Sequence, residues 1–549
     1  MRGEHRTRIR IASWLLGAAL VSMSWWAAGG TGAVAGQPTG APIAAAATPI
    51  SGAAASAAAT GTLPLGDPDL AETRTSAAVA PGVTFTRIVR GASSATDRFA
   101  IDVAVEGSED AANEIADQLV AAGHQAMVEP LASSPPDDTG TAPLGYRVRV
   151  APFASRDDAT ATQEQLVADG FDGTRVVFTG EDGGETSGPW VIHVLAVDPA
   201  TFTGSVAPVL ASEIVPGKER VADIARRTQA LAVVNAGFFV VGPTDGTPGD
   251  LAGVSVIDGH LLSEAVNGRS ALILPSTEGV GARVAAVTTT VTATAGDGES
   301  RVVDGVNREP GLIRACGGVG GDQPTEAPKH DFTCTDDSEL IHFTPAFGQI
   351  TVAGDGIEVA LDADGIVLEL RERRGGEIPR DGAVLSGTGD AADWLEAHAQ
   401  PGTQLRVDAR VLADGEVLAL ADTAGIVNGG PRLLADGELA ISAAAEGFSW
   451  DEDPGFYYRF GVRRNPRTMA GVTADGTLLF VTVDGRQPGW SVGASFEESA
   501  AIMRALGATD AVNLDGGGST AMAIGDQLVN RPSDATGERP DGDAIVLLP

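Results

Sequence analysis

The feature that most restricts the fold of this sequence is an internal repeat. Residues 99–105 alternate as a strand does and precede a helical stretch that ends at Gly123, a residue suited to a left-handed helix cap. Residues 146–150 alternate in the same way and precede a second helical stretch, which ends at Gly170. Short strand-like runs follow both helices. Two strand–helix–strand halves predict a ferredoxin-like βαββαβ unit, which we expect within a domain over residues 67–185.

The chain begins with the layout of a secretory signal peptide. A basic start is followed by an apolar run over residues 11–28 and by Ala-Val-Ala at 33–35, a cleavage signature. We therefore expect a signal peptide over residues 1–35 and a secreted or cell-envelope protein with no membrane span after cleavage. An uncleaved anchor is the alternative, because the apolar run approaches the length of a span. Residues 36–66, rich in Ala, Gly, Pro and Thr, predict a flexible linker.

The length of the chain requires more than one domain. Its 549 residues exceed the roughly 250–300 at which a single hydrophobic core stops growing. We expect a second, larger domain over residues 186–549, where short β-like runs are divided by turn signals such as Asp258-Gly259. Residues 280–420 read as an irregular insertion within it. The predicted class is α+β, with a mixed or antiparallel sheet in the larger domain.

Charge and cysteine count exclude several classes of protein. A formal charge of −36 argues against counterion-driven binding of nucleic acid. Two cysteines are too few for a disulfide-built scaffold or for a Cys-cluster metal site. In an exported protein Cys316 and Cys334 can pair, and we expect a disulfide between them. Two free thiols are the alternative.

The most specific signal for chemistry is a glycine-rich station directly after an apolar strand. Three consecutive glycines remove every side chain beside Asp515, as expected where a bulky ligand lies against backbone amides. A flexible loop without a ligand is the alternative. The expected ligand contacts are Asn513, Gly516, Gly517, Gly518, Ser519 and Thr520.

Two further stations place an amide side chain beside glycine. Asn235 follows an apolar strand, and Gly237 would permit close approach of a ligand to the backbone. Asn428 precedes Gly429 and Gly430, which form a bent loop whose exposed N–H groups suit an anion. Taken singly, each station is also consistent with a tight turn. We nevertheless include these five residues among the predicted substrate contacts.

A fourth station combines arginine and aspartate. A predicted hairpin over residues 469–483 would bring Arg467 back towards Asp484 and Arg486. Arginine forks bind phosphate or carboxylate in two-point fashion, which lysine does not reproduce. The alternative is a surface salt bridge between Asp484 and Arg486, whose spacing puts both on one face of a strand.

The repeat region resembles the SPOR domain. The resemblance covers roughly residues 95–180 and rests on Arg149-Val150-Ala151-Pro152-Phe153 and the helix start at Ser155 that follows. It implies binding to the glycan strands of peptidoglycan and therefore a role in targeting to the cell wall. The alternative is a scaffold unit that packs on the larger domain and binds nothing.

The four stations together resemble the phosphodiester glycosidase family, which includes N-acetylglucosamine-1-phosphodiester alpha-N-acetylglucosaminidase. The resemblance covers about residues 188–549. It implies a hydrolase that releases the sugar from a sugar-1-phosphodiester of an envelope or exopolysaccharide glycan and leaves a phosphomonoester. The motifs are Asn235-Ala236-Gly237-Phe238-Phe239, Gly429-Gly430-Pro431-Arg432-Leu433, Pro466-Arg467-Thr468, Asp484-Gly485-Arg486 and Asn513-Leu514-Asp515-Gly516-Gly517-Gly518-Ser519.

The chemistry implied by this resemblance suggests roles for individual residues. Arg467 and Arg486 would clamp the phosphodiester, and a carboxylate would stabilise an oxocarbenium-like centre, attack it or activate water. The catalytic candidates are Asp484 and Asp515, with Glu498 third. The same carboxylates, with asparagine side chains, are also suitable ligands for Ca²⁺ or Mg²⁺.

Two other classes of function remain open. One is a non-catalytic protein that binds the cell wall or a polysaccharide, in which the glycine loop merely holds a sugar. The other is a metal-dependent phosphodiesterase that cuts the P–O bond rather than the C–O bond. The expected partners are a glycan or sugar phosphate and, through the SPOR-like unit, peptidoglycan.

Overall fold

A computed structural model describes most of the chain. The predicted signal peptide and most of the predicted linker lie outside the described residues. Leu63 and Leu65 are fully buried, so the last residues of the predicted linker belong to the folded body. None of the helices in the described part of the chain has the length and apolar character that a bilayer crossing requires. The described residues are 61–138, 143–266, 268–275, 281–316, 323–324, 333–450 and 453–549.

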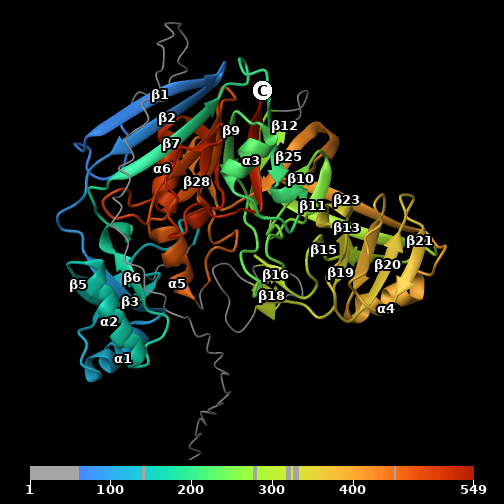
Figure 1. The fold of residues 1–549 in the computed structure, drawn as a ribbon. Coiled ribbons are helices and arrows are strands. Elements are labelled where there is room, and N and C mark those ends of the chain that lie inside the picture. The colour runs from blue at the N-terminus through green and yellow to red at the C-terminus, as the bar shows by residue number, and fades with distance from the viewer. Residues whose placement is uncertain are drawn as a thin grey trace, which may run out of the picture. The chain divides into compact units, whose positions relative to one another are not determined.

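The centre of the fold is an eight-stranded sheet in which consecutive neighbours pair antiparallel (Figure 1). β7 reads as an almost unbroken apolar run because both faces of this sheet are covered. One face packs on α6 (Phe496–Ala505). In order, the strands are β1 (Glu72–Ala80), β2 (Val83–Arg90), β7 (Trp190–Val197), β29 (Leu478–Val483), β28 (Arg467–Thr473), β30 (Ala508–Asn513), β26 (Arg432–Ala435) and β27 (Glu438–Leu439).

A five-stranded sheet packs against the other face through a shared hydrophobic cluster that includes Val234, Phe480 and Ile545. Its outer side is covered by α3 (Val221–Thr228), which buries Val221 and Ile224. The order is β32 (Gln527–Leu528), β31 (Met522–Ile524), β9 (Ala232–Asn235), β33 (Asp543–Leu548) and β8 (Ser205–Leu210).

The region predicted as an irregular insertion forms regular sheets instead. A long sheet contains β11 (His260–Ser263), β10 (Ser255–Ile257), β25 (Thr423–Asn428), β12 (Ser270–Pro275), β13 (Arg283–Ala295), β23 (Leu405–Ala413), β24 (Glu416–Val417) and, paired with β13, β14 (Ser300–Val303). A second sheet packs against α4 (Gly389–His398). It contains β15 (Gly305–Val306), β19 (Leu340–Phe343), β22 (Ala383–Gly387), β20 (Ile357–Leu361) and β21 (Val367–Arg371). The alternation of apolar and polar residues that indicates a strand is not evident in this region, because many of its strands are short and buried on both faces.

The predicted disulfide is confirmed. It joins Cys316 to Cys334, whose Cα atoms are 6.0 Å apart. It lies at a small sheet of β16 (Ile313–Arg314), β18 (Thr333–Thr335) and β17 (Gln323–Pro324).

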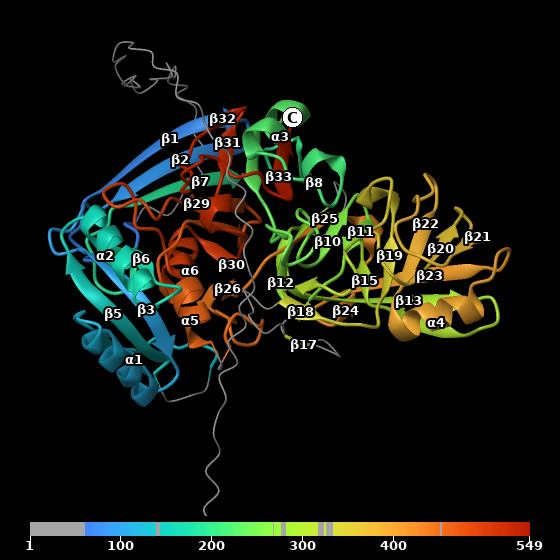
Figure 2. The ribbon, with the colours of Figure 1, turned by 60° about the horizontal axis from the view of Figure 1, so that its bottom comes forward.

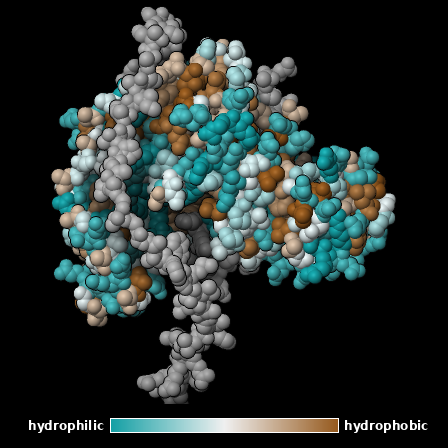
Figure 3. Space-filling view, viewed as in Figure 1, coloured by the Kyte–Doolittle hydropathy of each residue, from teal (hydrophilic) through white to brown (hydrophobic). Residues whose placement is uncertain are grey.

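On the face drawn in Figure 3 hydrophilic side chains dominate, with scattered apolar areas between them, as the acidic composition leads one to expect.

The repeat forms a separate four-stranded antiparallel sheet with the order β4-β5-β3-β6. Both helices cover one face, where Leu119 and Leu166 pack on Val148 and Val150. Figure 2 shows the helices and strands of this unit side by side. In chain order the elements are β3 (Phe99–Glu106), α1 (Glu109–Ala121), β4 (Met127–Leu131), β5 (Gly145–Phe153), α2 (Arg156–Ala168) and β6 (Arg175–Phe178).

The sequence predicted that the domain containing this unit starts at residue 67, and this prediction is wrong. β1 and β2 pair with each other and then with β7, so they belong to the central sheet. The chain leaves that sheet after β2, forms the βαββαβ unit and returns as β7. Pairing of β2 with β7 is a long-range contact, and nothing in the local pattern of residues 72–90 indicates the partner.

Candidate functional site

The four predicted stations meet at one edge of the sheets. Arg467 at the start of β28 pairs with Val483 at the end of β29, and Met469 pairs with Asn513 at the end of β30. Asn235 ends β9, and its amide nitrogen donates a 2.8 Å hydrogen bond to the main-chain oxygen of Asp515. Segments that are far apart in the sequence therefore share one location.

Asn235 is part of the frame of this edge. Its side-chain oxygen accepts hydrogen bonds from the Thr468 hydroxyl at 2.7 Å and from the Ala521 N–H at 3.1 Å. The residue is fully buried, and its amide nitrogen already holds the Asp515 carbonyl. The side chain thus fixes the start of the glycine loop by joining three segments.

Asn428 and its neighbouring glycines also serve packing. The Asn428 side-chain oxygen accepts a 2.7 Å hydrogen bond from the Phe238 N–H. A Cβ atom on Gly237 would lie 2.3 Å from the Asn428 side-chain nitrogen, and one on Gly429 would lie 2.6 Å from the main-chain oxygen of Asn513. These glycines admit neighbouring protein atoms rather than a ligand.

Gly430 and Asn513 complete this packing. The Gly430 N–H donates to the main-chain oxygen of Asn513, and the Asn513 side chain returns a 2.9 Å hydrogen bond to the Gly430 carbonyl. Both partners are buried. The amide of Asn513 therefore joins the end of β30 to the loop that precedes β26.

The glycine loop itself lies against two guanidinium groups. A Cβ atom on Gly517, whose φ is +61°, would approach a terminal nitrogen of Arg486 to 3.2 Å. One on Gly518 would lie 2.1 Å from a terminal nitrogen of Arg539. Asp515 is half-buried and accepts a 2.8 Å hydrogen bond from the Gly516 N–H. The loop thus brings a carboxylate and two arginines together without intervening side chains.

The two arginines are held differently. Arg486 is exposed, and its guanidinium donates to the Asn465 side-chain oxygen at 2.9 and 3.2 Å. Arg539 forms an ion pair with Asp534 at 2.8 Å. Arg486 therefore keeps a net positive charge at the loop, whereas the charge of Arg539 is largely balanced.

Two carboxyls near Asp515 were missed by the sequence analysis. Burial raises the pKa of Asp543 to about 7; the Gly237 N–H opposes this rise, and the charge of Asp515 adds to it. Burial and the charge of Asp515 also raise the pKa of Asp541 well above its ordinary range. The available signal was Asp541-Gly542-Asp543, two acids directly before an apolar strand.

Several polar atoms around these carboxyls have no hydrogen-bond partner among the described residues. They include one carboxyl oxygen of Asp543 and the hydroxyl of Thr520. Buried polar atoms normally find partners. Their concentration beside the glycine loop marks the place where water or a polar ligand would complete the site.

Asp484 lies behind this surface and is fully buried. One of its oxygens accepts a 2.8 Å hydrogen bond from the Trp490 indole, and the other accepts a 3.0 Å hydrogen bond from the Arg531 N–H. His193 lies 3.5 Å from the first oxygen. The structure therefore places Asp484 as a support for the segment at Arg531.

Glu498 occupies the third position of α6. It completes a capping box with Ser495 and forms a two-point ion pair with Arg464, with distances of 2.7 to 2.9 Å. Both of its oxygens are engaged in holding the helix and its neighbour. This differs from the catalytic role predicted for it, because the capping interaction turns the carboxylate towards the protein.

Arg467 also departs from its predicted role as a clamp. It is buried, it donates to the main-chain oxygens of Ala494 and Phe460, and its guanidinium lies 4.4 Å from the centre of the Phe496 ring. Burial, followed by the nearby charge of Arg486, lowers the pKa of Arg467 to about 9. Arg467 joins α6 to the sheet, whereas Arg486 and Arg539 are the arginines that face the loop.

Metal ligation was left open by the sequence. Within the described ranges, no group of three or more His, Cys, Asp or Glu side chains is arranged to hold a metal ion.

Comparison with protein families matches two parts of the chain. Residues 355–548 match the family described as phosphodiester glycosidase, and residues 95–176 match the SPOR domain. The first range contains the glycine loop, Arg486 and the carboxyls beside them. The second coincides with the βαββαβ unit and leaves β1 and β2 outside it, in agreement with the sheet pairing.

Solved structures extend the likeness over most of the chain. A Burkholderia pseudomallei protein described as exported is 35% identical, with a TM-score of 0.81, and the match covers 89% of this chain and 99% of that one. A hypothetical protein from Synechocystis is 19% identical, with a TM-score of 0.51, over 88% of this chain and 81% of that one. The latter likeness concerns the fold alone. Comparison with curated proteins finds no match.

Proposed function

The chain belongs to the phosphodiester glycosidase family, and we propose that it hydrolyses sugar-1-phosphodiester linkages of cell-envelope or exopolysaccharide glycans. The observation that supports this most is the meeting of Asp515, the glycine loop and Arg486 at one sheet edge. A phosphodiester carries one negative charge. Arg486 presents a guanidinium group beside the glycine loop, where no side chain stands between it and the backbone. This combination suits a sugar phosphate better than a neutral glycan.

In the proposed reaction, water adds to the anomeric carbon while the bond from that carbon to the phosphate oxygen breaks. The bonding electron pair leaves with the phosphate, so the products are the free sugar and a phosphomonoester. Asp515 stabilises the positive charge that develops on the sugar and accepts the proton that water loses. Arg486 balances the charge that gathers on the departing phosphate.

The two buried carboxyls support this assignment to Asp515. Carboxylates held close together do not all ionise, and burial favours the neutral form. The raised pKa values of Asp541 and Asp543 mean that both retain protons towards neutral pH, whereas Asp515 is the half-buried member of the group. Asp515 is therefore the carboxylate suited to touch a substrate as an anion.

Hydrolysis of a small sugar-1-phosphodiester in ¹⁸O-labelled water tests the proposal. We expect the label in the released sugar, because the C–O bond is the one cut. Label in the phosphate would instead support the metal-dependent phosphodiesterase. Binding without turnover, unchanged in an Asp515→Asn variant, would support the non-catalytic alternative.

We further propose that the βαββαβ unit is a ferredoxin-like SPOR domain that directs an exported enzyme to peptidoglycan. The family match and the exported relative support this location. Cosedimentation of the full chain with purified peptidoglycan tests it. A chain that stays in the supernatant at low and at physiological salt would favour the scaffold alternative.

A further inference from the structure

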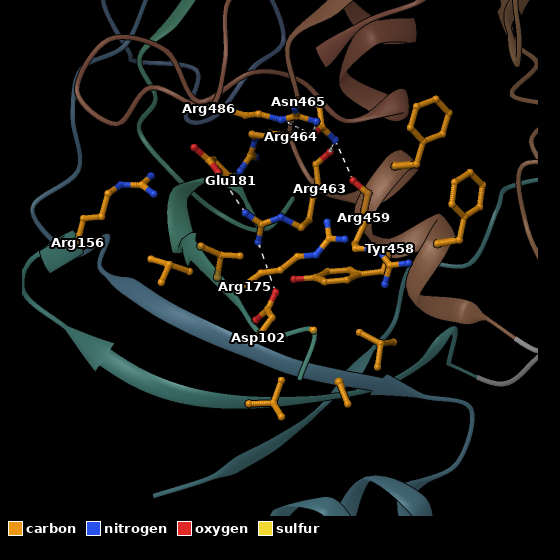
Figure 4. A pocket seen from close by; sticks show the side chains of 18 residues that line it. Asp102, Arg156, Arg175, Glu181, Tyr458, Arg459, Arg463, Arg464, Asn465 and Arg486 are labelled. Atoms are coloured by element: carbon orange, nitrogen blue, oxygen red, sulfur yellow. Dashed lines mark hydrogen bonds and ion pairs between the residues drawn. The ribbon is translucent and has the colours of Figure 1, made fainter. Parts of the chain in front are cut away.

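An arginine-lined cavity lies where the SPOR unit faces the segment around α5 (Pro454–Tyr457). Its volume is about 450 Å³, and its walls come from β3, β6 and residues 456–465 (Figure 4). The helices of the SPOR unit cover the other face of its sheet. The cavity is therefore bounded by the open face of that sheet and by the larger domain.

Contacts between charged and polar side chains hold these two walls together. Arg149 of β5 binds the Asp182 carboxylate through both terminal nitrogens, at 2.5 and 3.0 Å. Arg463, from the opposite wall, also binds Asp182 and reaches Glu181 at 3.1 Å. Arg463 and Glu181 line the cavity themselves, and Arg149 and Asp182 lie beside it, so these contacts fix the distance between its walls.

The charge of the cavity is opposite to that of the chain. The protein carries a formal charge of −36, yet the walls contain more arginines than acids. The acids are Asp102 and Glu181. The arginines are Arg156, Arg175, Arg459, Arg463, Arg464 and Arg486.

Half of these arginines are balanced by carboxylates. Arg463 pairs with Asp182 and Glu181, Arg464 pairs with Glu498, and Arg459 lies 3.3 Å from Asp453. The other half, Arg156, Arg175 and Arg486, form no ion pair in the described part of the chain. They come from three separate segments, and Figure 4 shows them around the same space.

Arg175 experiences this excess of positive charge directly. Reduced contact with water, followed by the nearby charges of Arg459 and Arg463, lowers its pKa from the ordinary value. Like charges held close together repel, and a bound anion would remove that cost.

Arg486 lies between the cavity and the glycine loop and faces both. That residue lines the cavity, and its terminal nitrogen would lie 3.2 Å from a Cβ atom on Gly517. A substrate that extends from the loop past Arg486 would enter the cavity next.

We propose that this cavity binds a second phosphate group of the substrate, so that the enzyme acts on glycans with a phosphodiester in successive repeats. The inference rests on the proposed function. The phosphate nearest the bond that breaks lies at Arg486 and the glycine loop. The next phosphate along the glycan enters the cavity, where Arg156 and Arg175 line different sides and each offers a guanidinium group to its oxygens.

Steady-state kinetics on two substrates test the proposal. One substrate carries a single sugar-1-phosphodiester, and the other is an oligomer with two in succession. We expect Arg175→Ala and Arg156→Ala each to raise KM for the oligomer about tenfold and to leave kinetics on the single diester unchanged. Arg373→Ala is the matched control, because Arg373 is an exposed arginine far from this cavity in the sequence and has one surface ion pair. Unchanged oligomer kinetics in both cavity variants would overturn the proposal.

Calorimetric titration of the full chain with inorganic phosphate separates this inference from the proposed function. We expect the wild type and Arg373→Ala each to bind two phosphates weakly, one at Arg486 with the glycine loop and one in the cavity, and Arg175→Ala to bind only the first. Equal binding by all three proteins would refute an anion site in the cavity, whether or not the enzyme turns over. Loss of phosphate binding with unaltered oligomer kinetics would show that free phosphate, rather than a glycan phosphate, is the ligand, and would overturn the substrate assignment.

Discussion

The sheet edge that carries the predicted stations and the arginine-lined cavity share Arg486, yet they are built in opposite ways. At the edge, Asn235, Asn428 and Asp484 are buried, and their side chains bond to neighbouring protein. In the cavity, Arg156 and Arg175 have no ion pair among the described residues. At the edge the polar groups hold the structure in place, whereas the cavity combines paired arginines, such as Arg463, with arginines that have no ion pair within the described part of the chain.

The difference shows how to read polar motifs in a sequence. A polar residue after a buried strand often completes the hydrogen bonding of adjacent strands, because buried polar groups require partners. Such a residue shapes the site without touching the substrate. The groups best placed to bind a ligand lie at the glycine loop: Asp515, Arg486 and the hydroxyls beside them.

Replacing Asp515 by Asn should have the largest effect on activity. The substitution keeps the shape of a half-buried side chain and removes its charge, so we expect kcat on a sugar-1-phosphodiester to fall about 10²–10³-fold. The melting temperature should change little. Asp526→Asn, at an exposed turn, is the control. Normal turnover by Asp515→Asn would move the catalytic assignment to another carboxyl.

Replacing Asp543 by Asn should change how stability depends on pH. The folded pKa of about 7 lies above the unfolded value, so the wild type loses stability as pH rises from about 4 to 7 and no further above that. The loss is on the order of 4 kcal/mol, since one pKa unit corresponds to about 1.4 kcal/mol.

Asn at position 543 can still accept from the Gly237 N–H and has no charge to bury. Unfolding in urea at pH 5 and pH 8 should therefore show a smaller loss for the variant than for the wild type. Equal losses in both proteins would mean that Asp543 titrates normally and that the three carboxyls do not share their charge.

Replacing Arg486 by Lys should lower kcat/KM about 10–100-fold. A lysine is a point charge and does not reproduce the fork that faces the loop and the Asn465 side chain. Arg531→Lys is a useful control, because the Arg531 main chain, rather than its guanidinium, bonds to Asp484. Retained activity in Arg486→Lys would argue against two-point binding of phosphate.

Some of this organisation could be predicted from the sequence. The stations were expected to converge because polar residues followed several apolar strands, and the hydrogen bond between Asn235 and Asp515 brings two of them together. The disulfide followed from an exported chain with two cysteines, and it is present. Local patterns carried these inferences.

Other features depend on contacts that no local pattern reports. β2 and β7 are neighbours in the central sheet, and the SPOR unit is inserted in the chain between them. The pKa values of Asp541 and Asp543 arise from burial that only the assembled sheets produce. Arg175 and Arg486 both line the cavity, although they are distant in the sequence and no local pattern links them.

Replacing Glu498 by Gln should have the smallest effect on activity. It tests whether Glu498 supports the structure at this sheet edge rather than acting on the substrate. Gln at this position can still accept from the Ser495 N–H, so the helix cap is kept. Arg464 is buried and would lose its charged partner, although it retains the carbonyls of Gly180 and Gly184. We expect a loss of about 1–3 kcal/mol in unfolding free energy and activity within about twofold of the wild type. Glu497→Gln, the exposed neighbour on the same turn, should change neither. A roughly hundredfold slower turnover without loss of stability would show that Glu498 acts on the substrate, and the frame would then include a catalytic group.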